Sequence, residues 1–135
     1  MLYALDKAWW EQYLVEARRR FAGALVSPQR IPGVHREMAW LNHEATNSGA
    51  AALAQAAWWC VERVVLLGYD CQHTGGQRHW HGDHPRHLGN AAGIDKWPAH
   101  FEAVLPRLAG MEVINATRET ALPYFPRMTL EDALA

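Results

Sequence analysis

The histidine-rich segment between residues 71 and 94 carries the strongest chemical signal in this chain. Five of the eight histidines of the sequence lie there: His73, His79, His81, His84 and His87. A neutral imidazole can act as a general acid or base, hold a phosphate group or ligate a metal ion. We therefore expect at least one of these side chains to face a ligand, with His79, His81 and His84 as the candidates for proton transfer.

The spacing of His79 and His81 also suits a metal site. Alternate side chains of an extended segment point to the same side, so these two imidazoles would face one ion. His84 or a carboxylate would complete the set, and His79, His81 and Asp83 are the candidate ligands of Mg²⁺, Mn²⁺ or Zn²⁺. The spacing matches no closed zinc motif, so a loop held together by imidazole hydrogen bonds is the alternative.

A second candidate site is the run of Asn47, Ser48 and Gly49, which precedes an alanine-rich helical stretch. The start of a helix presents free backbone N–H groups and the positive end of the helix dipole, and both suit a phosphate group. Asn and Ser are also frequent helix caps, so the run could serve the helix alone. We predict that these three residues contact a phosphate-bearing ligand.

The remaining candidates follow two predicted strands. An apolar, β-branched run at 63–67 ends shortly before Asp70, and a second strand at 112–115 ends at Asn115, two residues before Thr117. Open parallel sheets bind their ligands beyond the carboxyl ends of the strands. Asp70, Asn115 and Thr117 are therefore expected at the same ligand site.

The elements that must position these residues alternate between helix and strand. Apolar periodicity and capping residues predict helices at 7–21, 49–61 and 95–109 and a short helix after Thr129. Strands are predicted at 24–27, 37–42, 63–67 and 112–115. Pro106 is expected to kink or shorten the third helix. The segment 71–94 has no periodicity and is predicted to be a long loop.

Length and composition fit a single α/β domain spanning residues 1–135. The chain is 50% hydrophobic and 20% charged, which is ordinary for a globular protein. Its net charge of −1 gives no strong field that would attract nucleic acid or an anionic membrane. Two cysteines make no disulfide framework; Cys60 is expected in the core and Cys71 near the site. The absence of a signal segment predicts a cytoplasmic protein.

Two tryptophan pairs, Trp9–Trp10 and Trp58–Trp59, lie in predicted helices. Adjacent helical residues point about 100° apart, so a pair cannot be buried against one flat surface. Either the helix is buried over a wide arc, or one ring of the pair meets a ligand or a partner chain. We expect wide burial for the second pair, and for the first pair both alternatives stay open.

Several of these motifs resemble one protein family. Asn47, Ser48 and Gly49, the stretch 64–70 (VVLLGYD) and the loop 79–85 (HWHGDHP) look like phage and bacterial Rossmann-like proteins related to the 6-hydroxymethylpterin diphosphokinase MptE-like domain. The stretch 113–117 (VINAT) is similar to the same family, and the likeness covers most of the chain. A more distant similarity is to bacterial sialyltransferases with a Rossmann-like fold.

The resemblance implies a small, truncated, Rossmann-like three-layer domain with a mostly parallel sheet. It implies a nucleotide- or nucleotide-sugar-dependent transferase, in which Asn47, Ser48 and Gly49 hold the nucleotide. Asp70 would orient a ribose or a metal-bound diphosphate, and a histidine of the 79–87 loop would be the acid or base.

Relatives usually begin with a further βα unit upstream of Asp6, and that unit is expected to be missing here. Its loss would expose a sheet edge, which readily pairs with a second chain. The resemblance therefore suggests a homodimer with Trp9 or Trp10 in the contact. The alternative function is a non-catalytic relative that binds a host protein or sequesters a nucleotide.

Overall fold

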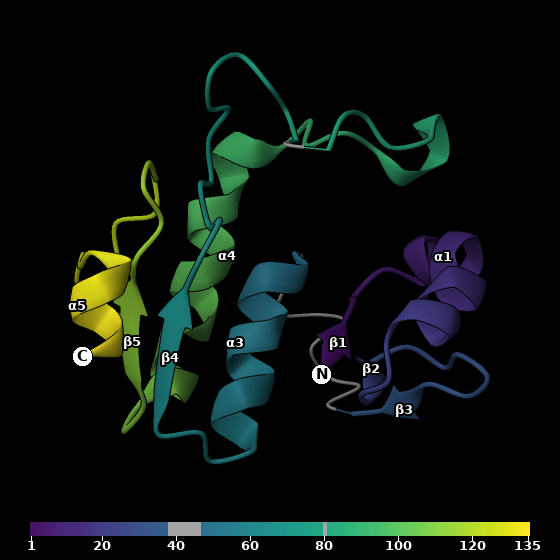
Figure 1. Cartoon of the computed structure of the whole chain (residues 1–135), viewed down its shortest axis with the longest axis horizontal. Coiled ribbons are helices and arrows are strands. Elements are labelled where there is room, and N and C mark those ends of the chain that lie inside the picture. Colours follow the sequence, from purple (N-terminus) through teal and green to yellow (C-terminus); the bar gives the residue numbers. More distant parts are fainter. Residues whose placement is uncertain (38–46, 80) are drawn as a thin grey trace.

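The computed structural model describes residues 1–37, 47–79 and 81–135 (Figure 1). The strands are β1 (Leu2–Tyr3), β2 (Leu25–Ser27), β3 (His35–Arg36), β4 (Arg63–Leu66) and β5 (Glu112–Asn115). The α-helices are α1 (Lys7–Arg20), α3 (Ser48–Trp58), α4 (Trp97–Val104) and α5 (Leu130–Leu134). Short 3₁₀ helices are η1 (Arg86–Leu88), η2 (Ile94–Lys96) and η3 (Leu105–Leu108). The protein is therefore of the mixed α/β class, as its sequence predicts.

The described strands form two parallel sheets. In the first sheet β2 lies between β1 and β3, with Leu2 beside Leu25. In the second sheet β4 pairs with β5, and Val64 lies beside Val113. Parallel strands are thus confirmed, and the finer expectation of one three-layer Rossmann-like sheet stays a prediction.

Helices pack against both faces of the β4–β5 sheet, because side chains alternate between the two faces along a strand. Leu66 and Val113 belong to the core that is shared with α3 and α4. Val65 and Ile114 instead pack with Ala133 of α5. Figure 1 shows α5 and α3 on opposite sides of this sheet. This two-sided packing explains why the sequence of β4 is apolar without alternation.

Helix α1 covers the other sheet with the apolar stripe that its sequence predicts. Trp10 is fully buried, and Ala17 lies in the same cluster with Ile31 and Val34. The indole Nε1 of Trp10 donates a hydrogen bond to the carbonyl of Ala4 at 3.0 Å. Because Trp10 is enclosed within the chain, a ligand or partner could meet Trp9 only.

The second tryptophan pair corrects the expectation of wide burial. Trp58 and Trp59 are 59% and 41% exposed. Helix α3 ends at Trp58, and Cys60 follows in the left-handed conformation with φ of 55°. The chain therefore turns away before these rings can reach the core. Cys60 is exposed as well, so its predicted place in the core is also wrong.

Other differences from the predicted elements have local causes. The strands β1 and β3 are only two residues each and carry no periodic signal. Pro98 lies in the first turn of α4, as predicted, and the chain passes into η3 just before Pro106. The predicted strand at 37–42 lies outside the described residues except for Glu37, which is not in a strand. No helix of the described chain is long and apolar enough to cross a membrane.

Replacement of Trp10 by alanine should lower the free energy of unfolding by about 3–5 kcal/mol, because it removes a fully buried ring and leaves a cavity. Val15 lies on the same helix and is 83% exposed. The control variant Val15→Ala should change the free energy of unfolding by less than about 0.5 kcal/mol. Urea denaturation followed by circular dichroism measures both values, and equal effects would contradict the packing of α1.

Candidate functional site

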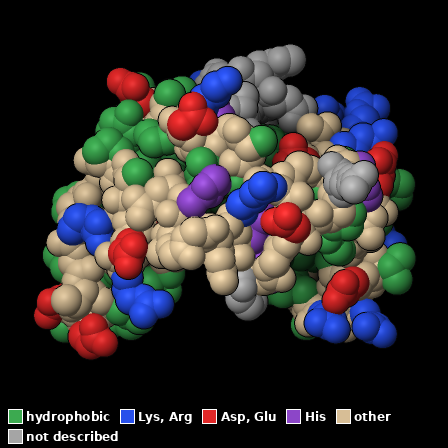
Figure 2. Space-filling view, turned by 90° about the horizontal axis from the view of Figure 1, so that it is seen from above, with side chains coloured by type: hydrophobic (Ala, Val, Ile, Leu, Met, Phe, Trp, Pro, Cys, Tyr) green, Lys and Arg blue, Asp and Glu red, His purple; other side chains and the backbone are tan. Residues whose placement is uncertain are grey.

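A cavity of about 710 Å³ lies between α1, α3 and the histidine-rich loop. Its volume falls in the range of about 300–1,000 Å³ that is usual for small-molecule sites. The polar residues of its lining include Lys7, Asn47, Ser48, Asp70, His79 and His84. Figure 2 shows histidine side chains near the middle of the molecular surface on the side that carries this loop. Candidates that are far apart in the sequence are thus brought together.

The start of α3 forms one wall of the cavity. The Asn47 side chain caps the helix, since its Oδ1 accepts a hydrogen bond from the Ala50 amide at 2.9 Å. Its Nδ2 lies 3.1 Å from Nδ1 of His100. The Ser48 hydroxyl accepts a hydrogen bond from the Leu5 amide at 3.1 Å. Both side chains therefore have structural roles, while the N-terminal end of α3 faces the cavity.

At the same wall, close packing leaves little room for a side chain at Gly49. A Cβ atom added there would lie 3.0 Å from Cε1 of Tyr69 and 3.3 Å from Cζ of Phe101. These distances are tight, so glycine lets the turn after β4 approach α3 closely. This close approach helps to place Asp70 opposite the start of the helix.

The turn after β4 brings Asp70 to the cavity. Gly68 and Cys71 both adopt positive φ angles, 72° and 50°, so the backbone reverses around Asp70. The Asp70 Oδ2 accepts a hydrogen bond from the Thr74 hydroxyl at 3.2 Å. Cys71 is buried and lines the cavity, which agrees with its predicted place near the site.

Asn115 and Thr117 lie behind this turn and do not line the cavity. Both are buried, and the Thr117 hydroxyl accepts a hydrogen bond from the Tyr69 amide at 3.0 Å. The Asn115 Oδ1 accepts from the Thr117 amide at 3.0 Å. Arg127 donates from its guanidinium to the carbonyl of Thr117. These residues support the turn that carries Asp70 from behind the cavity, and their predicted contact with a ligand stays a prediction.

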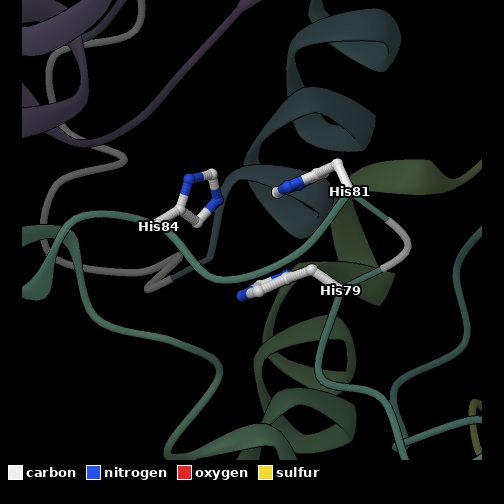
Figure 3. A group of neighbouring side chains, drawn as sticks. All are labelled: His79, His81 and His84. Atoms are coloured by element: carbon white, nitrogen blue, oxygen red, sulfur yellow. The ribbon is translucent and has the colours of Figure 1, made fainter.

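His79, His81 and His84 form one cluster at the edge of the cavity (Figure 3). Each offers a ligand nitrogen, and these nitrogens all lie within 4.8 Å of one another. The rings of His79 and His81 are stacked with centroids 5.2 Å apart. They share one side as predicted, but His81 lies in a turn and not in the extended segment that the prediction assumed. The His84 ring lies 4.9 Å from that of His79 and 4.7 Å from that of His81.

The third member of this cluster is His84 and not Asp83. The Asp83 side chain is exposed, and its Oδ2 lies 3.9 Å from the Arg78 guanidinium. Of the two alternatives that the sequence left open, His84 is the one grouped with His79 and His81, and these three histidines could hold a metal ion.

The cluster favours neutral imidazoles. Partial burial lowers the pKa of His79, and the neighbouring His84 and His81 lower it further. Partial burial and His81 likewise lower the pKa of His84, with Asp83 opposing the shift. These shifts favour the neutral form of both rings, which is the form that accepts a proton or binds a metal.

Of two further cavity residues, the search for chemical motifs missed Lys7, whereas a ligand contact of the Trp9–Trp10 pair was one of the alternatives left open. Lys7 and Trp9 line the cavity from the first turns of α1. The Lys7 ammonium lies 3.4 Å from the Glu11 carboxylate, and the Trp9 ring packs edge-on against Trp10 at 5.0 Å. The signal that would have found Lys7 is its position just after a parallel strand. That strand, β1, is too short to be recognised in the sequence.

No family model matches the chain, and neither the curated proteins nor the solved structures contain a match. The resemblance of its motifs therefore stays a prediction. The chemistry of the site follows from its own side chains: one ammonium, two carboxylates, three imidazoles and two indoles line the cavity. These groups suit a ligand that has both an anionic end and an aromatic ring.

The two cysteines should differ in reactivity. Burial raises the pKa of Cys71 to about 11, and the charge of Asp70 adds to the shift. Roughly one thousandth of this thiol is then thiolate at pH 8, and the thiolate is the reactive form. Iodoacetamide at pH 8 should alkylate the Cys71→Ser variant, which keeps exposed Cys60, at least about tenfold faster than the Cys60→Ser variant. Mass spectrometry measures both rates, and equal rates would refute the burial of Cys71.

Proposed function

We propose that this protein is a transferase-like enzyme that binds a nucleotide or a nucleotide-sugar in the cavity. The observation that carries the proposal is that Asn47, Asp70 and His79 line one cavity, although they come from the start of α3, the turn after β4 and the histidine-rich loop. The space is large enough for such a ligand, and its polar groups lie on several sides of it. A Rossmann-like relationship would agree with this placement, since Asp70 follows the carboxyl end of a parallel strand.

The cavity offers a separate contact for each part of a nucleotide. The N-terminal end of α3 and the ammonium of Lys7 would hold the phosphates. The carboxylate of Asp70 would accept hydrogen bonds from the ribose hydroxyls. The Trp9 ring would stack on the base, a contact that contributes about 1–3 kcal/mol in other proteins.

The histidine cluster would act where the transferred group leaves its donor. A neutral imidazole of His79 or His84 can accept the proton of an attacking hydroxyl. His81 lies beside both rings and can donate a hydrogen bond to the leaving group. The cluster would also fit a divalent ion that takes imidazole ligands, such as Zn²⁺, because the buried Nε2 of His79 has no hydrogen-bond partner within the described part of the chain. Such an ion would neutralise a leaving diphosphate.

A non-catalytic protein that sequesters a nucleotide is the second candidate. One observation favours it: the side chains of Asn47 and Ser48 are already engaged in a helix cap and in a bond to Leu5. A site whose polar groups are engaged in this way can still bind phosphates through backbone N–H groups. Product formation separates the two candidates, because both of them predict binding.

Binding of nucleotides should depend on Asp70. Isothermal titration with uridine, cytidine and adenosine diphosphates and their sugar conjugates, in the presence of EDTA, identifies the class that binds. Replacement Asp70→Asn should then weaken binding about 10- to 100-fold, because hydrogen bonds to charged groups contribute about 1.5–3 kcal/mol.

The matched control is Asp95→Asn, which removes an exposed carboxylate of η2 outside the cavity lining. It should leave the affinity unchanged. If no nucleotide of the panel binds, or if both variants weaken binding equally, the proposal fails. Binding without transfer to any acceptor would favour the sequestering protein.

A further inference from the structure

We propose that His79, His81 and His84 form a site for a zinc-class divalent ion, with one coordination position open toward the cavity. The proposal deepens the proposed function and rests on it for the ligand that would fill the open position. The ion site itself stands on the geometry of the three side chains.

The three imidazoles are close to the arrangement that a single ion requires. Their ligand nitrogens lie within 4.8 Å of one another, whereas three histidines on one tetrahedral zinc ion hold their nitrogens about 3.3 Å apart. Figure 3 shows His79 and His81 extending side by side toward His84 on the opposite side of the loop. Small rotations of the rings within this loop would close the remaining gap.

An unpartnered buried atom points to a ligand at this place. The Nε2 of His79 is buried, and no hydrogen bond reaches it from the residues that the structure describes. Buried polar atoms are otherwise almost always paired, so an orphaned imidazole nitrogen needs an explanation. An ion among the three rings would give this nitrogen its partner.

Helix α1 supports the cluster from outside. The Nδ1 of His84 lies 3.5 Å from the hydroxyl of Tyr13, which leaves Nε2 of the same ring as the metal ligand. The Tyr13 ring is itself held against Trp9, with centroids 5.3 Å apart. Histidine ligands usually have such a partner on the second nitrogen, which fixes the orientation of the ring. Tyr13 is therefore a positioning residue for His84.

The ligand set selects the class of ion. Three imidazoles without a carboxylate suit Zn²⁺ and its neighbours in the transition series, whereas Mg²⁺ and Ca²⁺ prefer oxygen ligands. His79 and His84 also line the cavity, so the open position faces the space in which Asp70 lies. A phosphate oxygen or a water molecule would occupy it. Imidazole nitrogens bound to an ion cannot accept a proton, so in this assignment the ion, placed beside the phosphates, would supply positive charge in place of the proton transfer considered above.

The test is metal binding by the full chain after removal of metals with EDTA. Isothermal titration should show one Zn²⁺ ion per chain and no binding of Mg²⁺. Co²⁺ should give the visible absorption of a four-coordinate site. The variants His79→Ala, His81→Ala and His84→Ala should each lose at least about 100-fold in zinc affinity, and Tyr13→Phe should lose about 10-fold.

The matched control is His35→Ala, which removes an exposed imidazole from β3. It should bind zinc like the parent chain, and circular dichroism verifies that every variant is folded. Failure of Zn²⁺ to bind, or equal losses in His35→Ala and the cluster variants, overturns the site. The nucleotides are titrated in EDTA, so the two tests are independent. Zinc binding without nucleotide binding would support the ion site and refute the proposed function. Nucleotide binding without zinc binding would support the proposed function and refute the ion site.

Discussion

Leu5 lies two residues after the end of β1 but packs in the core of the β4–β5 part of the molecule. Its amide donates to the Ser48 hydroxyl at the start of α3. One residue earlier, the carbonyl of Ala4 accepts the indole N–H of Trp10 in α1. Two consecutive residues therefore fix both α1 and α3, which form opposite walls of the cavity. The geometry of the site depends on this short connection, because α1 packs in one core cluster and α3 packs in another.

The histidine-rich loop forms the remaining wall of the cavity between α1 and α3. It begins after Asp70, in the turn that follows β4, and returns to α4, and in Figure 1 it extends across to the side of α1. The Tyr13 hydroxyl meets His84 there, so the loop is anchored at its outer end by a residue of α1. A loop of this length has little regular structure to hold it. An ion bound by its three clustered imidazoles, as we propose, would hold residues 79–84 of this loop together.

The sequence by itself determined the features that depend on neighbouring residues. Asn47 caps α3 through the amide of Ala50, three residues away, and Thr129 caps α5 through the amide of Asp132 at the same spacing. Such bonds form wherever the local sequence allows them. The apolar runs of β4 and β5 can also be recognised in the sequence, since a strand that is covered on both faces has a continuous run of apolar residues. The start of α3, the strand before Asp70 and the grouping of histidines in one loop could therefore all be predicted.

Only the tertiary structure decided which of these residues share a surface. His84 rather than Asp83 joins the cluster because the irregular backbone of the loop sets side-chain directions, and no periodicity encodes it. Thr117 supports the turn at Tyr69 because the two residues meet only after β4 and β5 pair. Lys7 and Trp9 reach the cavity because β1, two residues long, joins a sheet by pairing with β2. These placements depend on contacts between residues far apart in the chain, and such contacts form only when the whole core packs.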